Sequence, residues 1–324
     1  MTREEVDLFG QGDLVFGCRH LPDQAPVAGV LVCPGPPFDG GPDEGRSARL
    51  ARRLAAAGVA VQRFRHRGAW PSDGDLRDAS FAGLVEDAGA ALALLRERAG
   101  VTRVGFVGAR LGALVAARLA RDVPGAPMVV WAPVADGRSA LERAARARAA
   151  RRLHGGRSSP APAVPWPAGP VPGTTGGGWA EAGVARPSRP AALAGAPPVP
   201  DLFEAPLAAD LAGGAVGSFA DELGPRPRDL LVVDTGDEGW DDEREAVVAS
   251  CRGRGLAVDV AKHPCDAERD GRVVPLDAGD ELVDDTVGWL LARLGPGHVP
   301  PSGPGGAPPG GTAHPPGGAP GSAW

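Results

Sequence analysis

The chain has 324 residues, a hydrophobic share of 43% and a formal net charge of −6. This length fits one large α/β domain with additional unstructured segments, and the hydrophobic share is sufficient for a sizeable core. The charges are spread along the chain and form no basic stripe, which argues against a nucleic-acid-binding protein. No apolar run reaches the length that crosses a bilayer, so we expect no membrane span.

The cysteine pattern and the N-terminal segment indicate the cellular setting. There is no CxxC pair and no spacing typical of a metal site, so we expect no metal, no cofactor and reduced thiols at the four cysteines, Cys18, Cys33, Cys251 and Cys265. Residues 1–10 are acidic and lack the apolar core of a secretory signal. The sequence therefore predicts a cytoplasmic protein, and it gives no indication of an oligomeric state.

The N-terminal half alternates strand and helix patterns after an initial β-hairpin of residues 6–9 and 14–18. Short apolar runs predict strands at 29–33, 59–64, 101–107 and 128–131. Apolar residues at helical spacing predict helices at 46–57, 81–95, 112–121 and 139–153. Such alternation is typical of a mostly parallel sheet with helices on both faces.

Two segments of low complexity divide the rest of the chain. Residues 155–200 are rich in Gly, Pro, Ser and Ala, and are predicted to be a disordered insertion because they cannot bury enough apolar surface. Ordered patterns resume near Leu202, with strands expected at 230–234 and 256–261 and helices at 243–252 and 281–294. Residues 295–324 are predicted to be a disordered tail. Residues 1–154 and 201–294 would then form two parts of one α/β domain.

The most informative motif joins the strand at 101–107 to the following Ala-rich helix. It reads Gly108-Ala109-Arg110-Leu111-Gly112. Serine hydrolases have G-x-S-x-G at such a turn, where glycines permit the sharp bend and the serine is the nucleophile. Arg110 takes the place of that serine. Because a guanidinium stays protonated and offers no lone pair, conventional Ser-His-Asp catalysis is not expected.

Two upstream loops fit the same arrangement. Residues 31–38 (LVCPGPPF) occupy the place of the loop that supplies an oxyanion-hole N–H. Residues 64–75 (FRHRGAWPSDGD) are similar to the hydrolase pattern F-D-x-R-G-x-G-x-S-x-G-D. Arg65 replaces the usual Asp of that pattern, and Trp70 replaces a Gly.

On these motifs the chain resembles, within the α/β-hydrolase superfamily, the second type of hydrolase associated with the exosortase A system. The similarity spans about residues 28–153 and is carried by residues 36–38, 78–81, 108–113 and 131–137. Residues 39–44 depart from the pattern, as does the insertion. The resemblance implies an α/β-hydrolase-like fold with Arg at the nucleophile elbow, which is the turn formed by residues 108–112. It also implies a setting in exopolysaccharide and surface-protein export. The cap of that fold would be degraded, its place being taken by the insertion and by the helix predicted at 139–153, which is rich in Arg and is called the Arg-rich helix below.

The elbow itself offers a candidate binding site. A helix N-terminus favours anions through its dipole and its free N–H groups, and Arg110 would add a positive charge there. We therefore expect an acyl or anionic ligand at Arg110, Leu111, Gly35 and Pro36. The alternative is that Arg110 pairs with a buried carboxylate such as Glu86 or Asp87, since buried charges are normally paired.

The remaining triad positions are incomplete. Asp237 follows the strand at 230–234, where hydrolases have the triad acid, or else it is a solvated turn residue. The histidine is expected just before the last helix, but residues 276–281 contain none, and the nearest is His263, after the preceding strand. His66 could lie at the mouth of the site, although a histidine in a loop is more often simply exposed.

Two hypotheses about function follow. In the first, the chain is a non-catalytic hydrolase relative that binds an acyl or anionic ligand or a partner. In the second, it is an active esterase, thioesterase or acyltransferase in which Asp237 and His263 serve a displaced nucleophile, either Cys33 or Ser80. The simpler interpretations are that Cys33 is a small core residue and that Ser80 caps a helix. The Arg-rich helix is either a surface for an anionic partner or a solvated face.

Overall fold

The structure is a computed structural model that describes residues 2–36, 43–153, 205–225, 228–234, 241–263 and 280–295. The predicted insertion at 155–200 and all but the first residue of the predicted tail lie outside these residues. Among the described helices, none combines the length and apolar character that crossing a membrane requires.

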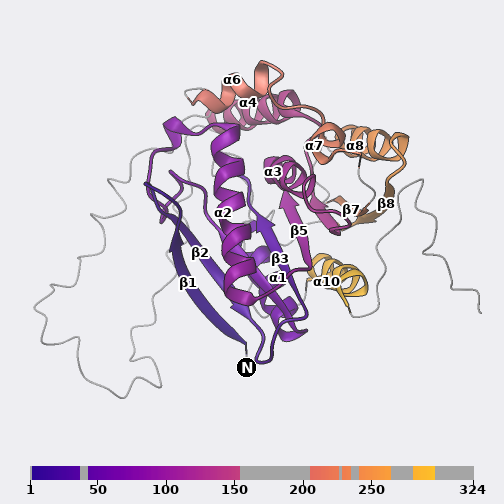
Figure 1. The fold of residues 1–324 in the computed structure, drawn as a ribbon. Coiled ribbons are helices and arrows are strands. Elements are labelled where there is room, and N and C mark those ends of the chain that lie inside the picture. The colour runs from indigo at the N-terminus through magenta and orange to yellow at the C-terminus, as the bar shows by residue number, and fades with distance from the viewer. Residues whose placement is uncertain are drawn as a thin grey trace, which may run out of the picture.

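In the described part of the chain, eight strands form one sheet in the order β1-β2-β4-β3-β5-β6-β7-β8. β1 pairs with β2 and β2 with β4 in antiparallel fashion, while all other neighbours are parallel. The predicted hairpin and mostly parallel sheet are therefore confirmed (Figure 1). The strands are β1 Arg3–Phe9, β2 Val15–Leu21, β3 Ala28–Cys33, β4 Val59–Phe64, β5 Val104–Ala109, β6 Met128–Trp131, β7 Asp229–Asp234 and β8 Ala257–Lys262.

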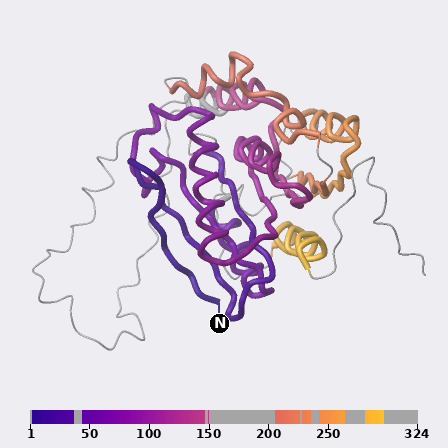
Figure 2. The backbone as a smooth tube through the Cα atoms, in the orientation of Figure 1, coloured from indigo at the N-terminus to yellow at the C-terminus, as the bar shows by residue number. Residues whose placement is uncertain are grey.

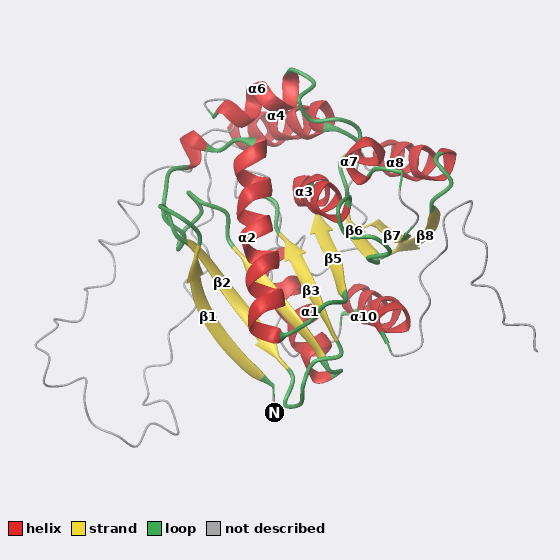
Figure 3. Cartoon of the chain, in the orientation of Figure 1, coloured by secondary structure: helices red, strands yellow, loops and turns green. Residues whose placement is uncertain are grey.

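Helices cover both faces of this sheet (Figure 3). They are α1 Asp43–Ala56, α2 Phe81–Ala99, α3 Leu111–Ala120, α4 Gly137–Leu153, α6 Pro206–Ala212, α7 Phe219–Leu223, α8 Asp241–Gly253 and α10 Glu281–Leu294, with a 3-10 turn η2 at Leu76–Asp78. Each long helix predicted from apolar spacing is present. The boundaries of α10 match the prediction, and those of the others differ by a few residues.

The core consists of two layers because successive side chains of a strand point to opposite faces. Leu31 and Phe106 pack with α2 and α3 on one face. Val30 and Val107, their neighbours in the chain, pack with α1 and α10 on the other. β3 and β5 are buried along their whole length, as expected of parallel strands that are covered on both sides. Packing on both faces holds β3 and β5 in place, and with them the loop that follows β3 and the turn that follows β5.

Two parts of the prediction need correction. The strand expected at 101–107 begins at Val104 and ends at Ala109. Residues 101–103 form the connection from α2, and the Arg103 carbonyl at the end of this connection accepts the Gly29 N–H at 2.9 Å. The short helices α6 and α7 were not predicted, since neither is long enough to show a helical repeat of apolar residues. Their signals were local, such as Pro206 in the first turn of α6 and the capping box of Ser218 in α7.

α4 and α6 pack against each other beyond the carboxyl ends of the central strands (Figures 1 and 2). Asp210 of α6 accepts the backbone N–H of Phe81 at 2.8 Å, and the N–H of Leu207 donates to the carbonyl of Ala79 at 2.8 Å. These bonds attach α6 to the start of α2. The two helices thus occupy the side of the sheet on which a cap was expected.

Candidate functional site

The turn between β5 and α3 has the strained backbone of a nucleophile elbow. Arg110, the residue before α3, adopts φ 52° and ψ −120°. A side chain other than glycine rarely adopts such angles, and they cost about 1–3 kcal/mol. The conformation is held by two bonds of the Arg110 backbone: its N–H donates to the Trp131 carbonyl and its carbonyl accepts the Ala113 N–H, each at 3.0 Å.

Both glycines of the motif are required by close backbone contacts. A Cβ on Gly108 would lie 2.7 Å from the Cα of Ala113, and a Cβ on Gly112 would lie 2.5 Å from the carbonyl oxygens of Cys33 and Pro34. Backbone atoms cannot move aside as a flexible side chain can. The predicted sharp turn is therefore confirmed, and it brings the loop after β3 against the first turn of α3.

That loop is where the predicted ligand-binding residues Gly35 and Pro36 lie. Pro36 is buried and Gly35 is partly buried. Proline has no N–H, so of these two residues only Gly35 can donate a backbone hydrogen bond. Leu111 begins α3, and the first N–H groups of a helix point outward to acceptors beyond it. The structure thus places Gly35 and Leu111 on two segments that touch at Gly112.

The two carboxylates considered as partners of Arg110 both contact Arg67. Asp87 is buried and accepts the Arg67 side chain at 2.5 Å and the Arg67 backbone N–H at 3.0 Å. Glu86 accepts the same guanidinium at 3.0 Å. Burial alone would raise the pKa of Asp87, but hydrogen bonds from His66 and Arg67 outweigh it and leave that pKa lowered. Asp87 is consequently a charged, fully engaged structural group.

His66 is buried, which corrects the interpretation of it as an exposed loop residue. Only 1% of its surface is exposed, and its ring packs edge-on against Phe64 with the centroids 4.9 Å apart. Its Nδ1 lies 3.3 Å from Asp87 and its Nε2 lies 3.3 Å from the Pro34 carbonyl oxygen. His66 therefore connects the loop after β3 to α2. The only sequence signal for this role was that His66 lies two residues after the strand that ends at Phe64.

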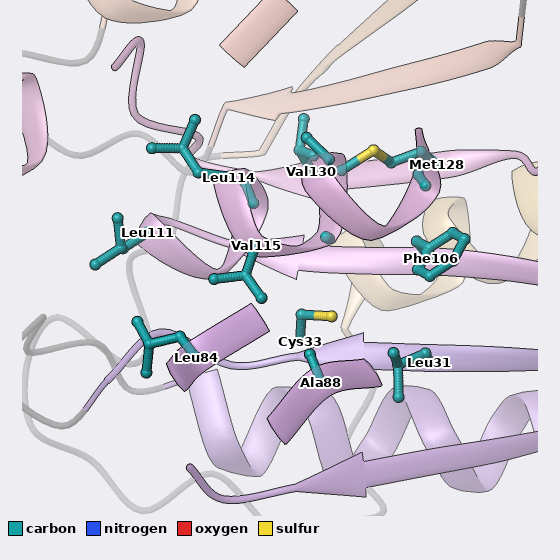
Figure 4. Packing of buried hydrophobic residues seen from close by; sticks show 14 of the residues in the cluster. Leu31, Cys33, Leu84, Ala88, Phe106, Leu111, Leu114, Val115, Met128 and Val130 are labelled. Carbon is teal, nitrogen blue, oxygen red and sulfur yellow. The ribbon is translucent and has the colours of Figure 1, made fainter. Parts of the chain in front are cut away.

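Cys33 and Ser80, the two candidate displaced nucleophiles, have structural roles. Cys33 is fully buried among apolar side chains that include Ala88 and Val115 (Figure 4). Burial raises the pKa of its thiol far above neutrality, so the reactive thiolate does not form there. Ser80 caps α2 by accepting the Gly83 N–H at 3.1 Å. Both simpler interpretations are confirmed.

His263 directly follows β8, the last strand of the sheet. Its N–H donates to the carbonyl of Asp234, the last residue of β7, at 2.9 Å. Its Nε2 lies 2.9 Å from a carboxylate oxygen of Asp285 on α10, which is 62% exposed. Asp237, the predicted acid, lies outside the described residues. The proposed pairing of Asp237 with His263 therefore stays a prediction.

An ion-pair cluster occupies the start of α10, where the triad histidine was expected. Asp280 caps this helix and lies 2.8 Å from the Arg49 guanidinium and 3.2 Å from that of Arg46. Both arginines come from α1 and are buried. An Asp before an amphipathic helix is a recognisable cap signal, but partners more than 200 residues away in the sequence could not be inferred from it.

The comparisons with known proteins agree with this arrangement. A family model described as serine aminopeptidase, S33, matches residues 26–164, which is less than half of the chain. A search of curated proteins gave no match. The matched range begins just before β3, includes the elbow and extends past the end of α4.

Several solved structures share the topology at low sequence identity. An esterase from Pyrococcus furiosus is 14% identical with a TM-score of 0.55, covering 90% of this chain and 91% of that one. A carboxyl esterase from Tuber melanosporum is 14% identical with a TM-score of 0.51, covering 90% and 87%. A candidate α/β hydrolase of unknown function from Agrobacterium tumefaciens is 15% identical with a TM-score of 0.52, covering 92% and 100%. Together with the strand order and the elbow, these similarities show that the chain has the α/β-hydrolase fold.

Proposed function

We propose that this chain is a non-catalytic relative of the serine hydrolases that binds an acyl or other anionic ligand at its elbow. The observation that carries the proposal is Arg110, which holds the strained backbone of a nucleophile between two indispensable glycines. Strain of this kind persists only where the surrounding structure imposes it, and it concentrates at functional sites. An arginine in that position cannot attack a carbonyl carbon, but it can hold a carboxylate.

The chemistry of the surrounding groups favours an anion. A guanidinium binds a carboxylate through two parallel hydrogen bonds, and the N-terminus of α3 contributes a positive dipole end. Hydrolases form their oxyanion hole from the N–H of the residue after the nucleophile and from an N–H of the loop after an upstream strand. Leu111 and Gly35 stand in those places, and their N–H groups would suit the oxygen atoms of a carboxylate. In this proposal the parts that stabilise a developing negative charge in a hydrolase stabilise the permanent charge of a bound ligand.

Binding and hydrolysis can be tested together with three proteins: wild type, Arg110→Ala and Arg110→Lys. Octanoate and its uncharged analogue octanamide are titrated by calorimetry. We expect octanoate to bind wild type more tightly than octanamide, and to lose about tenfold to 100-fold in Arg110→Ala, the range of a charge-assisted hydrogen bond. Arg110→Lys should be intermediate, because an ammonium lacks the planar fork.

The same proteins are assayed with p-nitrophenyl acetate. We expect wild type and Arg110→Ala to hydrolyse it at the same low rate. Wild-type hydrolysis well above that of Arg110→Ala would overturn the non-catalytic assignment. Octanoate affinity that is equal in all three proteins would overturn the anion site.

The alternative is an active esterase, thioesterase or acyltransferase that uses Asp237, His263 and a displaced nucleophile. The retained scaffold favours it, as does the position of His263 directly after the last strand, since hydrolases have the triad histidine after the acid in the chain. Labelling with a fluorophosphonate and with iodoacetamide tests it. A single-site adduct that disappears in His263→Gln would support this alternative, and absence of any adduct would remove it.

We also propose a finer classification and setting. The Arg-containing elbow and the Trp131–Gly137 segment support membership in the second type of exosortase-A-associated hydrolase, a cytoplasmic location and a role in exopolysaccharide or surface-protein export. The neighbouring genes provide the test. Adjacent exosortase or polysaccharide genes would support this classification, and their absence from the genome would overturn it.

A further inference from the structure

Three side chains that commonly bind metals gather on the N-terminal hairpin, at the antiparallel edge of the sheet. The register pairs Glu4 of β1 with His20 of β2, and Cys18 lies two residues before His20, on the same face. One donor atom from each side chain lies within 4.8 Å of the other two. We propose that Glu4, Cys18 and His20 bind a divalent metal ion, with Zn²⁺ as the ion that this sulfur, nitrogen and oxygen set fits best.

The distances agree with tetrahedral coordination. Bond lengths of about 2.3 Å to sulfur and about 2.0–2.1 Å to nitrogen place those two ligand atoms roughly 3.5 Å apart around Zn²⁺. The Cys18 Sγ and the His20 Nε2 are 3.5 Å apart. Glu4 has to move closer, and its side chain is free to do so because it is 38% exposed. Water would complete the coordination.

The environment of His20 agrees with this ligand set. The side chain is 99% buried, and its Nδ1, which forms no hydrogen bond within the described structure, faces the Glu4 carboxylate at 3.4 Å. A ring proton on Nδ1 suits that carboxylate. It leaves the lone pair on Nε2, the nitrogen beside Cys18, where the ion would bind.

Two arginines oppose the ion and make the proposal more specific. The Arg63 guanidinium lies 3.4 Å from the His20 Nε2, and Arg52 donates to Glu4 at 2.6 Å. The ion has to displace the Arg63 contact in order to reach Nε2. The Cys18 thiolate and the Glu4 carboxylate together balance a double positive charge. Replacing Arg63 by a neutral residue should therefore tighten binding.

The proton balance follows from the same groups. A free cysteine thiol ordinarily keeps its proton at neutral pH, and only the thiolate binds a metal. Formation of the sulfur–metal bond breaks the S–H bond and releases one proton to solvent. A glutamate is ordinarily ionised and an imidazole mostly neutral above about pH 7, so these two ligands contribute no further proton. Binding should release one proton per ion and should strengthen as the pH rises.

The test uses the full chain, titrated with Co²⁺ and then with competing Zn²⁺. Cobalt reports a thiolate ligand by an intense near-ultraviolet band. We expect one ion per chain, displacement by Zn²⁺ and one proton released. Cys18→Ser should abolish the band, and both Cys18→Ser and His20→Gln should weaken binding more than about tenfold. The control His263→Gln, which changes a histidine beside another carboxylate, should bind as wild type does.

Arg63→Gln separates the loss of a ligand from the loss of the fold. This variant should bind the ion more tightly than wild type, whereas a misfolded protein would bind it less tightly. Circular dichroism verifies the fold of every variant. Absence of stoichiometric binding to the folded wild-type protein would overturn the proposal. So would a cobalt band that persists in Cys18→Ser.

Discussion

The strained elbow predicts that glycine at position 110 is more stabilising than alanine, the reverse of the usual order. Both Arg110→Gly and Arg110→Ala remove the same guanidinium, so their difference isolates the backbone. Alanine retains the cost of φ 52° and ψ −120°, about 1–3 kcal/mol, which glycine avoids. Glycine adds about 0.4–1 kcal/mol of entropy to the unfolded chain. The net advantage of glycine is about 1 kcal/mol.

The assay is urea denaturation of the two variants, supported by thermal melts. A difference of 1 kcal/mol corresponds to about 2–4 °C for a domain of 150–250 residues. Arg121 at the end of α3 provides the matched control, because its φ of −48° and ψ of −37° are ordinary helical values. There, glycine should be less stable than alanine by about 0.5–1 kcal/mol. If position 110 behaved like position 121, the elbow would not be strained and the central observation of the proposed function would fail.

Three further predictions concern stability. Gly112→Ala should destabilise the protein by more than about 2 kcal/mol in denaturant unfolding, because the new Cβ would lie 2.5 Å from the Cys33 carbonyl oxygen; wild-type stability would contradict the close approach. Ser80→Ala should cost about 1 kcal/mol in the same assay through loss of the α2 cap, and an unchanged midpoint would count against that role. Asp280→Asn should be destabilised at pH 7. Burial raises the pKa of Asp280, but contacts headed by Arg49 outweigh this and leave the pKa lowered. The stabilisation is thus complete above the unfolded pKa of about 4 and disappears as the pH falls through the folded value, so the difference from wild type should shrink in acid. A difference that stays constant with pH would refute this.

The fold was predictable because its signals are local and repeated. Apolar runs such as 29–33 predict buried strands, and the apolar spacing of 281–294 predicts α10 with its boundaries. The elbow was predictable for a different reason, since two glycines around one residue after a strand have a specific steric meaning. The structure shows why glycine is required at position 112: the carbonyl oxygens of Cys33 and Pro34 leave no room for a Cβ there.

Contacts between distant segments were not predictable. The sequence shows an Asp before α10, but not that Arg46 and Arg49 of α1 contact it. It shows Cys18 and His20 two residues apart, which is not a usual metal spacing, and only the register of the hairpin brings Glu4 beside them. Such sites depend on strand pairing and helix packing, and these are decided by the whole fold rather than by a local pattern.

The packing of α4 against α6 has a consequence for how this chain can change in length. α4 ends at Leu153 and α6 begins at Pro206, and the folded domain holds these two helices together. The sequence between them, residues 155–200, is predicted to be disordered, and closing a flexible loop becomes less favourable only slowly as it grows, by roughly 0.6 kcal/mol for each doubling of its length. We therefore predict that insertions and deletions between these helices are nearly neutral for stability, which would make this position a natural place to shorten the chain or to graft a tag.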